Sequence, residues 1–103
     1  ENGIGTDDDR WRQKVLVDHL KMTHRAIGEG VDVRGYFHWS MMDNFEWAQG
    51  FSSRFGLIGI DYRTQKRTVK GSGRLYGDIA GRNGLSAALL EKFQEGIYRP
   101  RLS

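Results

Sequence analysis

The sequence contains no cysteine and only one proline in 103 residues, and it has no long uncharged apolar run. The absence of cysteine excludes disulfides and thiol catalysis. Because no apolar run of about 20 residues is present, we expect no membrane-spanning helix. The net charge of +3 comes from scattered basic residues, whereas a nucleic-acid interface needs a dense basic stripe with interleaved aromatics. We therefore expect no membrane and no nucleic acid as partners.

The composition present is that of one small globular domain. Hydrophobic residues make up 38% and charged residues 28% of the chain. A chain of this length buries about 60 to 65% of its unfolded surface, so one domain at most is expected. The chain opens on Glu1-Asn2-Gly3 without an initiator methionine, which we interpret as a piece of a longer polypeptide.

Residues 6–28 are predicted to form a helix. Thr6 followed by Asp9 has the spacing of a capping box, and three consecutive aspartates suit the positive end of a helix dipole. Gly28 and Gly30 are expected to end the helix. The apolar stripe recurs mostly at steps of three and four residues. It consists of Trp11, Val15, Leu16, Leu20 and Ile27.

Residues 31–39 alternate in the way that a strand with bulky side chains on both faces does. Further along, residues 55–62 are predicted to be extended, residues 63–66 to form a turn, and residues 69–82 to form a second helix. Residues 86–94 are amphipathic, and residues 98–103 are expected to be a loose tail. One strand between two helices cannot be a sheet alone, so the pattern predicts part of a parallel α/β architecture.

The most informative stretch is His38-Trp39-Ser40-Met41-Met42-Asp43-Asn44-Phe45-Glu46-Trp47. Two indoles flanking acids and an amide suit a sugar site, because a pyranose offers an apolar face and several hydroxyl groups. A buried aromatic cluster with polar caps is the alternative interpretation.

This stretch, W-S-x-x-D-N-F-E-W, closely resembles the signature of the family-1 glycoside hydrolases, the β-glucosidase family. The segments E-N-G, D-V-R-G-Y-F-H-W-S, R-F-G-L-I and K-R-T match the family pattern in the same order. The resemblance implies the α/β fold class and the C-terminal part of a (β/α)8 TIM barrel. Residues 1–85 would be the end of strand 7, helix 7, strand 8 (residues 33–39) and helix 8, and residues 86–103 would be a C-terminal extension.

The resemblance also implies a retaining β-glycosidase acting on terminal β-glucosyl or β-galactosyl residues, without a cofactor. Glu1 would be the catalytic nucleophile. The family's acid/base glutamate lies in an N-E-P motif, which does not occur in these residues. The isolated chain is therefore expected to be inactive, and its expected partner is the remaining N-terminal part of the barrel, on the same or a separate chain.

The family pattern further assigns four sugar-binding residues. Glu46 would accept hydrogen bonds from the hydroxyls at carbons 4 and 6, and Trp47 would donate its indole N–H to a neighbouring hydroxyl. Trp39 would be the stacking platform, and Phe55 would form a wall of the same pocket. The peptide bond between Trp39 and Ser40 is expected to be cis.

Two other functions stay open at this point. The chain could be a carbohydrate-binding module without catalysis, or an interaction piece whose strand edge docks on a partner. A metal site is not expected, because His19 and His24 do not share a helix face and His38 points away from Trp39. Family habit and the lack of a signal segment favour a cytoplasmic location.

Overall fold

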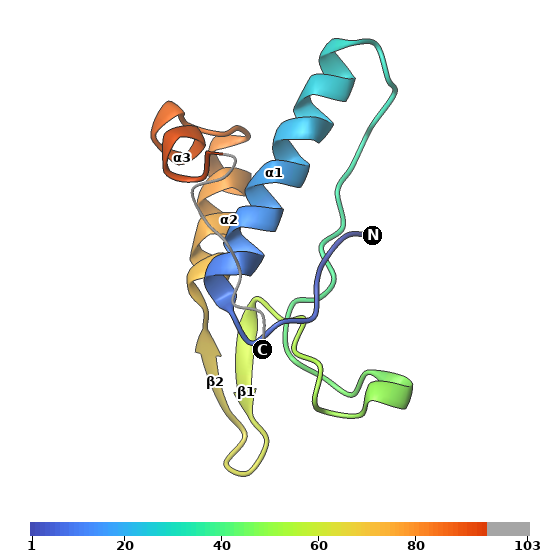
Figure 1. The fold of residues 1–103 in the computed structure, drawn as a ribbon, viewed down its shortest axis with the longest axis vertical. Helices are drawn as coiled ribbons and strands as arrows, with labels where there is room; N and C mark the ends of the chain where they lie inside the picture. The colour runs from blue at the N-terminus through green and yellow to red at the C-terminus, as the bar shows by residue number, and fades with distance from the viewer. Residues whose placement is uncertain (95–103) are drawn as a thin grey trace.

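The computed structural model describes residues 1–94 as two packed helices with a β-hairpin at one end (Figure 1). The elements are α1 (Asp9–Gly28), the short 3-10 helix η1 (Trp47–Gln49), β1 (Ile58–Asp61), β2 (Lys66–Val69), α2 (Gly71–Arg82) and α3 (Ala87–Lys92). After α1 the chain runs back along this helix as a long irregular segment, and η1 lies at the tip of a loop away from the helices (Figure 1).

The first predicted helix is confirmed, with a later start. Asp8 is the N-cap, and its Oδ1 accepts hydrogen bonds from the backbone N–H groups of Arg10 (3.1 Å) and Trp11 (3.4 Å). Thr6 does not cap the helix directly; its hydroxyl oxygen accepts a hydrogen bond from the Asp8 N–H. The helix ends at Gly28, as the glycine pattern predicts.

The hydrophobic core lies between α1 and α2. Leu16 and Val17 of α1 pack against Leu75 and Ile79 of α2, and all four side chains are buried. The partly buried side chains around them are Leu20, Tyr36, Tyr76, Leu85, Leu89 and Phe93. Because two of these come from the α3 region, this short helix caps the same core.

The strand predicted for residues 31–39 is wrong. The segment is extended, but its only ladder contact within residues 1–94 is an isolated parallel bridge between Asn2 and His38. A strand needs a continuous neighbour to exchange hydrogen bonds. In the part of the chain that the structure describes, the backbone hydrogen bonds that bridge this segment to another extended segment come from Asn2.

The predicted turn after residue 62 is present, but it leads into a strand rather than directly into a helix. β1 and β2 form an antiparallel pair in which Ile58 lies opposite Val69 and Asp61 opposite Lys66. The Asp61 Oδ1 accepts hydrogen bonds from the N–H groups of Arg63 and Thr64 and so stabilises the turn. The second helix therefore begins at Gly71, two residues later than predicted.

The amphipathic piece predicted at residues 86–94 is confirmed as α3. Ser86 caps it, with its hydroxyl accepting a hydrogen bond from the Leu89 N–H at 3.2 Å. The tail predicted at residues 98–103 lies outside the described residues. Within residues 1–94, every helix is too short or too polar to cross a membrane.

Candidate functional site

Asn2 anchors the N-terminal segment to the chain just before Trp39. Its backbone N–H donates to the Phe37 carbonyl (3.0 Å), and its carbonyl accepts from the Trp39 N–H (2.8 Å). Its side-chain Oδ1 lies 2.7 Å from the Tyr36 hydroxyl, which donates to it, and 2.8 Å from His19 Nδ1. Glu1 is exposed and directly precedes this anchor. The structure therefore brings Glu1 to the same edge as residues 37–39.

Gly3 allows the closest backbone approach in this region. A Cβ atom at this position would lie 1.9 Å from the Trp39 carbonyl oxygen, which is far inside van der Waals contact. A side chain at Gly3 would separate the two segments. Asn2 and Gly3 of the E-N-G motif therefore have structural roles, in addition to the catalytic role that the resemblance implies for Glu1.

Trp39 and Glu46 are in direct contact. The indole Nε1 of Trp39 donates a hydrogen bond to Glu46 Oε1 at 2.9 Å. The peptide bond between Trp39 and Ser40 is cis, as the resemblance predicts. The Trp39 side chain is only partly covered, with 41% of the residue exposed. An indole face and a carboxylate oxygen are therefore presented together at the surface.

Trp47 stands out from the rest of the chain at the start of η1. It is 84% exposed, and its backbone φ of 47° lies in the left-handed region, which is unusual for a bulky residue. The loop is closed beside it by the Glu46 N–H, which donates to the Gly50 carbonyl at 2.7 Å. Within residues 1–94, the Trp47 side chain makes no hydrogen bond or ring contact.

Phe55 lies where the loop returns to the N-terminal segment. Its carbonyl accepts a hydrogen bond from the Ser40 N–H at 3.2 Å. A Cβ built on Gly5 would come within 2.9 Å of the Phe55 ring, so the ring packs closely against that glycine. Phe55 is half-buried. The predicted residues thus lie on two adjoining segments, residues 1–8 and residues 39–55.

Asp43 is the polar centre of the loop, and no separate role was predicted for it from the sequence. Its side chain is fully buried and lies in two ion pairs, to Arg54 (2.8 Å) and Lys70 (3.0 Å). It also accepts hydrogen bonds from the N–H groups of Gly56 (2.9 Å) and Ile60 (3.4 Å). The sequence feature that could have indicated a buried ion pair is an aspartate close to two methionines and an aromatic residue, with basic residues further along the chain.

The pKa of Asp43 is lowered from its ordinary value. Burial alone would raise the pKa, but the hydrogen bonds from Arg54, Lys70 and the Gly56 backbone stabilise the charged form more strongly. Asp43 therefore stays ionised in the folded chain. The carboxylate holds the loop of residues 40–56 against the hairpin and the start of α2.

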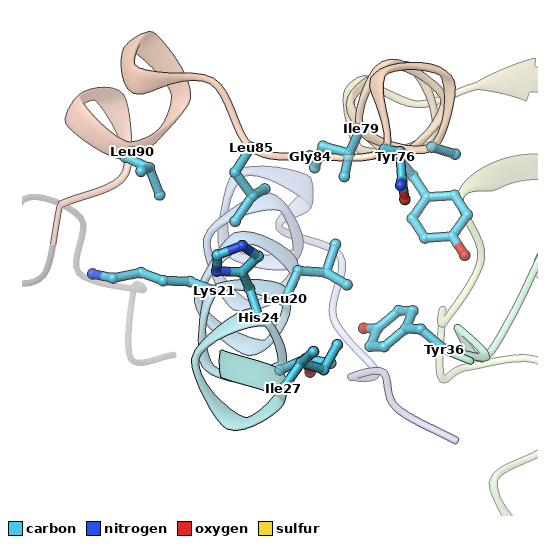
Figure 2. A pocket seen from close by; sticks show the side chains of 13 residues that line it. Leu20, Lys21, His24, Ile27, Tyr36, Tyr76, Ile79, Gly84, Leu85 and Leu90 are labelled. Atoms are coloured by element: carbon cyan, nitrogen blue, oxygen red, sulfur yellow. The ribbon is translucent and has the colours of Figure 1, made fainter. Parts of the chain in front are cut away.

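A cavity of about 480 Å³ lies between α1, α2 and α3, away from the predicted site (Figure 2). Figure 2 shows apolar and aromatic side chains pointing into it, among them Leu20, Tyr36, Tyr76 and Leu85. None of the predicted site residues lines this cavity. Among the described residues, no three His, Cys, Asp or Glu side chains gather closely enough to hold a metal ion.

These features define an α/β segment with exposed indoles beside a carboxylate. The family model for glycosyl hydrolase family 1 matches residues 1–85, so the chain belongs to this family. The chain is 49% identical to a β-galactosidase of Sulfolobus acidocaldarius over 89 residues. This match covers 86% of this chain and 18% of that protein. It is 47% identical to β-glucosidase A of Thermotoga maritima over 82% of this chain and 21% of that protein.

Solved structures give the same result. A β-glycosidase from Pyrococcus horikoshii superposes with a TM-score of 0.87 at 48% identity, over 89% of this chain and 22% of that chain. A β-glucosidase from Thermotoga maritima in complex with methoxycarbonyl-substituted glucoimidazole gives a TM-score of 0.80 at 46% identity. The match covers 82% of this chain and 22% of that chain. The chain thus spans about a fifth of the length of the relatives it matches.

Proposed function

We propose that the chain is the C-terminal segment of a retaining β-glycosidase barrel and that Glu1 is the catalytic nucleophile. It would supply the end of strand 7, helix 7 (α1), strand 8 and helix 8 (α2). The observation that supports the proposal is the pairing of Asn2, the residue after Glu1, with Phe37 and Trp39, because Trp39 is also the hydrogen-bond partner of Glu46. The relatives, named β-galactosidase and β-glucosidase, support the reaction class.

The chemistry requires two carboxyl groups about 5 to 5.5 Å apart. A Glu1 carboxylate oxygen attacks the anomeric carbon, the bond from that carbon to the leaving oxygen breaks, and an acid donates its proton to that oxygen. Water then attacks the anomeric carbon and gives its proton to the carboxylate that had acted as the acid. The bond between the sugar and Glu1 breaks, and Glu1 is released. The second group lies in the N-terminal part of the barrel, since the N-E-P motif is absent from these residues.

The sugar would bind between the two adjoining segments. Glu46 accepts hydrogen bonds from sugar hydroxyls, and its contact with Trp39 fixes the direction of one carboxylate oxygen. The half-exposed Trp39 ring offers a face for the apolar side of the pyranose, with Phe55 as a wall. Trp47 is free to donate its indole N–H, since no described side chain or backbone group accepts it. A terminal β-glucosyl or β-galactosyl residue is the proposed substrate.

The preceding part of the barrel is the proposed partner. Several large apolar side chains of residues 31–51 are exposed, including Phe37 at 78%. Exposed apolar area of this extent in one region is typical of a surface that is covered in the functional molecule. A cytoplasmic location stays a prediction.

A chimeric barrel tests the proposal. Residues 1–94 replace the matching C-terminal region of the Thermotoga maritima β-glucosidase A, and hydrolysis of an aryl β-glucoside is measured. We expect no turnover by the 103-residue chain alone, turnover by the chimera, and loss of turnover in Glu1→Gln. Glu29→Gln, which removes only an exposed ion pair with Arg25, is the matched control and should stay active. Turnover by the chain alone, or by the Glu1→Gln chimera, would contradict the proposal.

A carbohydrate-binding function without catalysis is the second candidate, and the exposure of Trp47 favours it. Exposed aromatic side chains are suited to stacking against sugar rings. The isolated chain would then bind sugars weakly, with binding lost in Trp47→Ala and unchanged in Glu1→Gln. Calorimetric titration with β-glucosides, run beside the chimera assay, separates the two functions.

A further inference from the structure

Arg12 is a buried cation whose contacts reach beyond its own helix. It lies in the first turns of α1 and is only 1% exposed. Burying a guanidinium group is costly unless its N–H groups are hydrogen-bonded and its charge is compensated. The two terminal nitrogens of Arg12 are hydrogen-bonded, while its Nε is buried without a hydrogen-bond partner among the described residues. The partners of the terminal nitrogens therefore show what Arg12 is placed to hold.

Two of these partners are backbone carbonyls from different loops. We name residues 1–8 the nucleophile loop and residues 40–56 the subsite loop. One terminal nitrogen of Arg12 donates both to the Thr6 carbonyl of the nucleophile loop and to the Arg54 carbonyl of the subsite loop. The Thr6 N–H donates to the same Arg54 carbonyl at 2.9 Å. Arg12 therefore lies at the junction of the two loops.

The other terminal nitrogen fixes the guanidinium to the helices. It donates to Asp9 Oδ1 at 2.8 Å, and Asp9 in turn accepts from the Ser72 N–H (2.8 Å) and hydroxyl (2.6 Å) at the start of α2. Burial would raise the pKa of Asp9, but the hydrogen bonds from Ser72 and Arg12 lower it overall, so the carboxylate is charged. The junction is thus tied to a frame made of α1 and α2.

The subsite loop has its own support, independent of Arg12. The Arg54 side chain binds Asp43 (2.8 Å) and the Ile60 carbonyl (2.7 Å), while Lys70 binds Asp43 from the other side. Losing Arg12 therefore leaves the internal geometry of that loop in place. What changes is the position of the nucleophile loop relative to it.

We propose that Arg12 is a positioning residue that sets the placement of Glu1 relative to the Glu46–Trp47 sugar subsite. The inference rests on the proposed function of Glu1 as nucleophile and adds the residue that aligns it. Without Arg12, the sugar still binds to the subsite loop, but Glu1 meets the anomeric carbon at a poorer distance and angle. The rate of glycosyl transfer to Glu1 falls more than sugar affinity does.

The experiment measures formation of the glycosyl–Glu1 bond in the chimeric barrel. The probe is 2,4-dinitrophenyl 2-deoxy-2-fluoro-β-glucoside: its anomeric carbon bonds to a Glu1 carboxylate oxygen, and dinitrophenolate leaves with the bonding electron pair and needs no proton. Time courses over a range of probe concentrations give the maximal labelling rate constant and the probe concentration at half-maximal rate. Mass spectrometry of the digested chimera identifies the labelled residue.

Arg12→Lys and Arg12→Met are the test variants. Lysine has one ammonium group and cannot reproduce the planar fork that reaches two loops and Asp9. We expect the maximal labelling rate constant to fall about 10- to 100-fold, as a displacement of about 1 Å at a reacting centre does. The half-maximal concentration should stay within about threefold, because that constant reports binding at the subsite.

Lys14→Met is the matched control. Lys14 is also a buried cation of α1, but within residues 1–94 its hydrogen bonds and its ion pair go to Asp18 of the same helix, at 2.6 Å, and not to either loop. This variant should label at the unaltered rate. A variant in which some molecules are irreversibly misfolded lowers the fraction labelled at the end of the reaction, whereas the rate constant of the folded fraction stays unchanged.

Three results would overturn the inference while leaving the proposed function intact. They are an unchanged labelling rate constant in both Arg12 variants, a loss confined to the half-maximal concentration, and an equal loss in Lys14→Met. If the unsubstituted chimera carries no label on Glu1, the proposed function fails, and the inference fails with it.

Discussion

The Trp39 indole nitrogen lies 2.9 Å from Glu46 Oε1 and donates a hydrogen bond to it. The two residues are seven positions apart, and the cis peptide bond after Trp39 lies between them. Within residues 1–94, the second carboxylate oxygen of Glu46 has no hydrogen-bond partner. The pair therefore combines an oriented acceptor with a free one.

We predict that Trp39→Phe weakens sugar binding more than loss of ring area explains. Phenylalanine keeps an aromatic face but cannot donate to Glu46. Loss of a hydrogen bond to a charged group costs about 1.5 to 3 kcal/mol, which corresponds to at least a tenfold rise in Kd. Calorimetric titration of the chimeric barrel with a glucoimidazole inhibitor measures the effect. In a cycle with Glu46→Gln, the two losses should not add; full additivity would show that the pair acts independently.

Gly3→Ala should separate the nucleophile loop from Trp39. The new methyl group would lie 1.9 Å from the Trp39 carbonyl, so the backbone must move, and labelling of Glu1 in the chimera should be slowed strongly. Gly77→Ala is the opposite control. It lies inside α2 with open space around the new methyl group, and it should stabilise the chain by about 0.5 to 1 kcal/mol. Equal effects of the two substitutions would contradict this reading of Gly3.

Asp43→Asn should lower the free energy of unfolding at pH 7 by about 3 kcal/mol, because it leaves two largely covered cations without their counter-charge. The cations are Arg54 and Lys70, and the Asp43 side chain is fully buried. Urea unfolding followed by tryptophan fluorescence measures the loss. Asp78→Asn removes an exposed ion pair with Arg82 and should change stability by less than about 0.5 kcal/mol.

The stabilising effect of Asp43 should also disappear in acid. Its pKa in the folded chain lies below the ordinary value of 3.8, so the stability it contributes is fully present above about pH 4 to 5 and is lost as the pH falls through the folded pKa. The difference in unfolding free energy between the unsubstituted chain and Asp43→Asn should therefore shrink from pH 5 towards pH 2. A difference that stays constant over this range would show that the charge of Asp43 is not what stabilises the loop.

Tyr36 should destabilise the folded chain at high pH. Burial, with a smaller effect of Tyr76, raises the pKa of Tyr36 from 10.0 to about 12. Between these values the unfolded chain loses the proton while the folded chain keeps it, so stability falls as the pH rises above 10. Tyr36→Phe loses the hydrogen bond to Asn2 at pH 8 but should lose less stability from pH 9 to 12, which urea unfolding at each pH will show.

The parts of the fold that local patterns encode could be predicted from the sequence. The start and end of α1 follow from its aspartates and Gly28, and the α3 position follows from its amphipathic pattern. The extended segment of β1 and the turn after it were predicted, but the second strand of the hairpin was missed because all four residues of β2 are exposed, which leaves no buried face to mark it. The strand at residues 31–39 was overpredicted because alternation indicates an extended chain but does not supply a partner.

The site could be predicted only in part, for a related reason. The indoles and acids of residues 39–47 lie together in the sequence, whereas the polar supports come from distant positions. Asp43 binds residues 11 and 27 positions away, and Arg12 binds a carbonyl 42 positions away. The spacing of residues along a helix or strand does not indicate such long-range contacts. The sequence therefore gives no sign that Arg12 differs from the other charged residues of its helix.

Because Trp47 is exposed, its fluorescence can report on what covers this part of the chain. Trp47 is 84% exposed and Trp39 41%, while Trp11 is partly buried, and a water-facing indole emits at longer wavelength than a covered one. Association with the remainder of a barrel, or arrival of a sugar, would transfer that ring into a drier environment and shift its emission to the blue. Assembly could then be followed in real time without any attached dye.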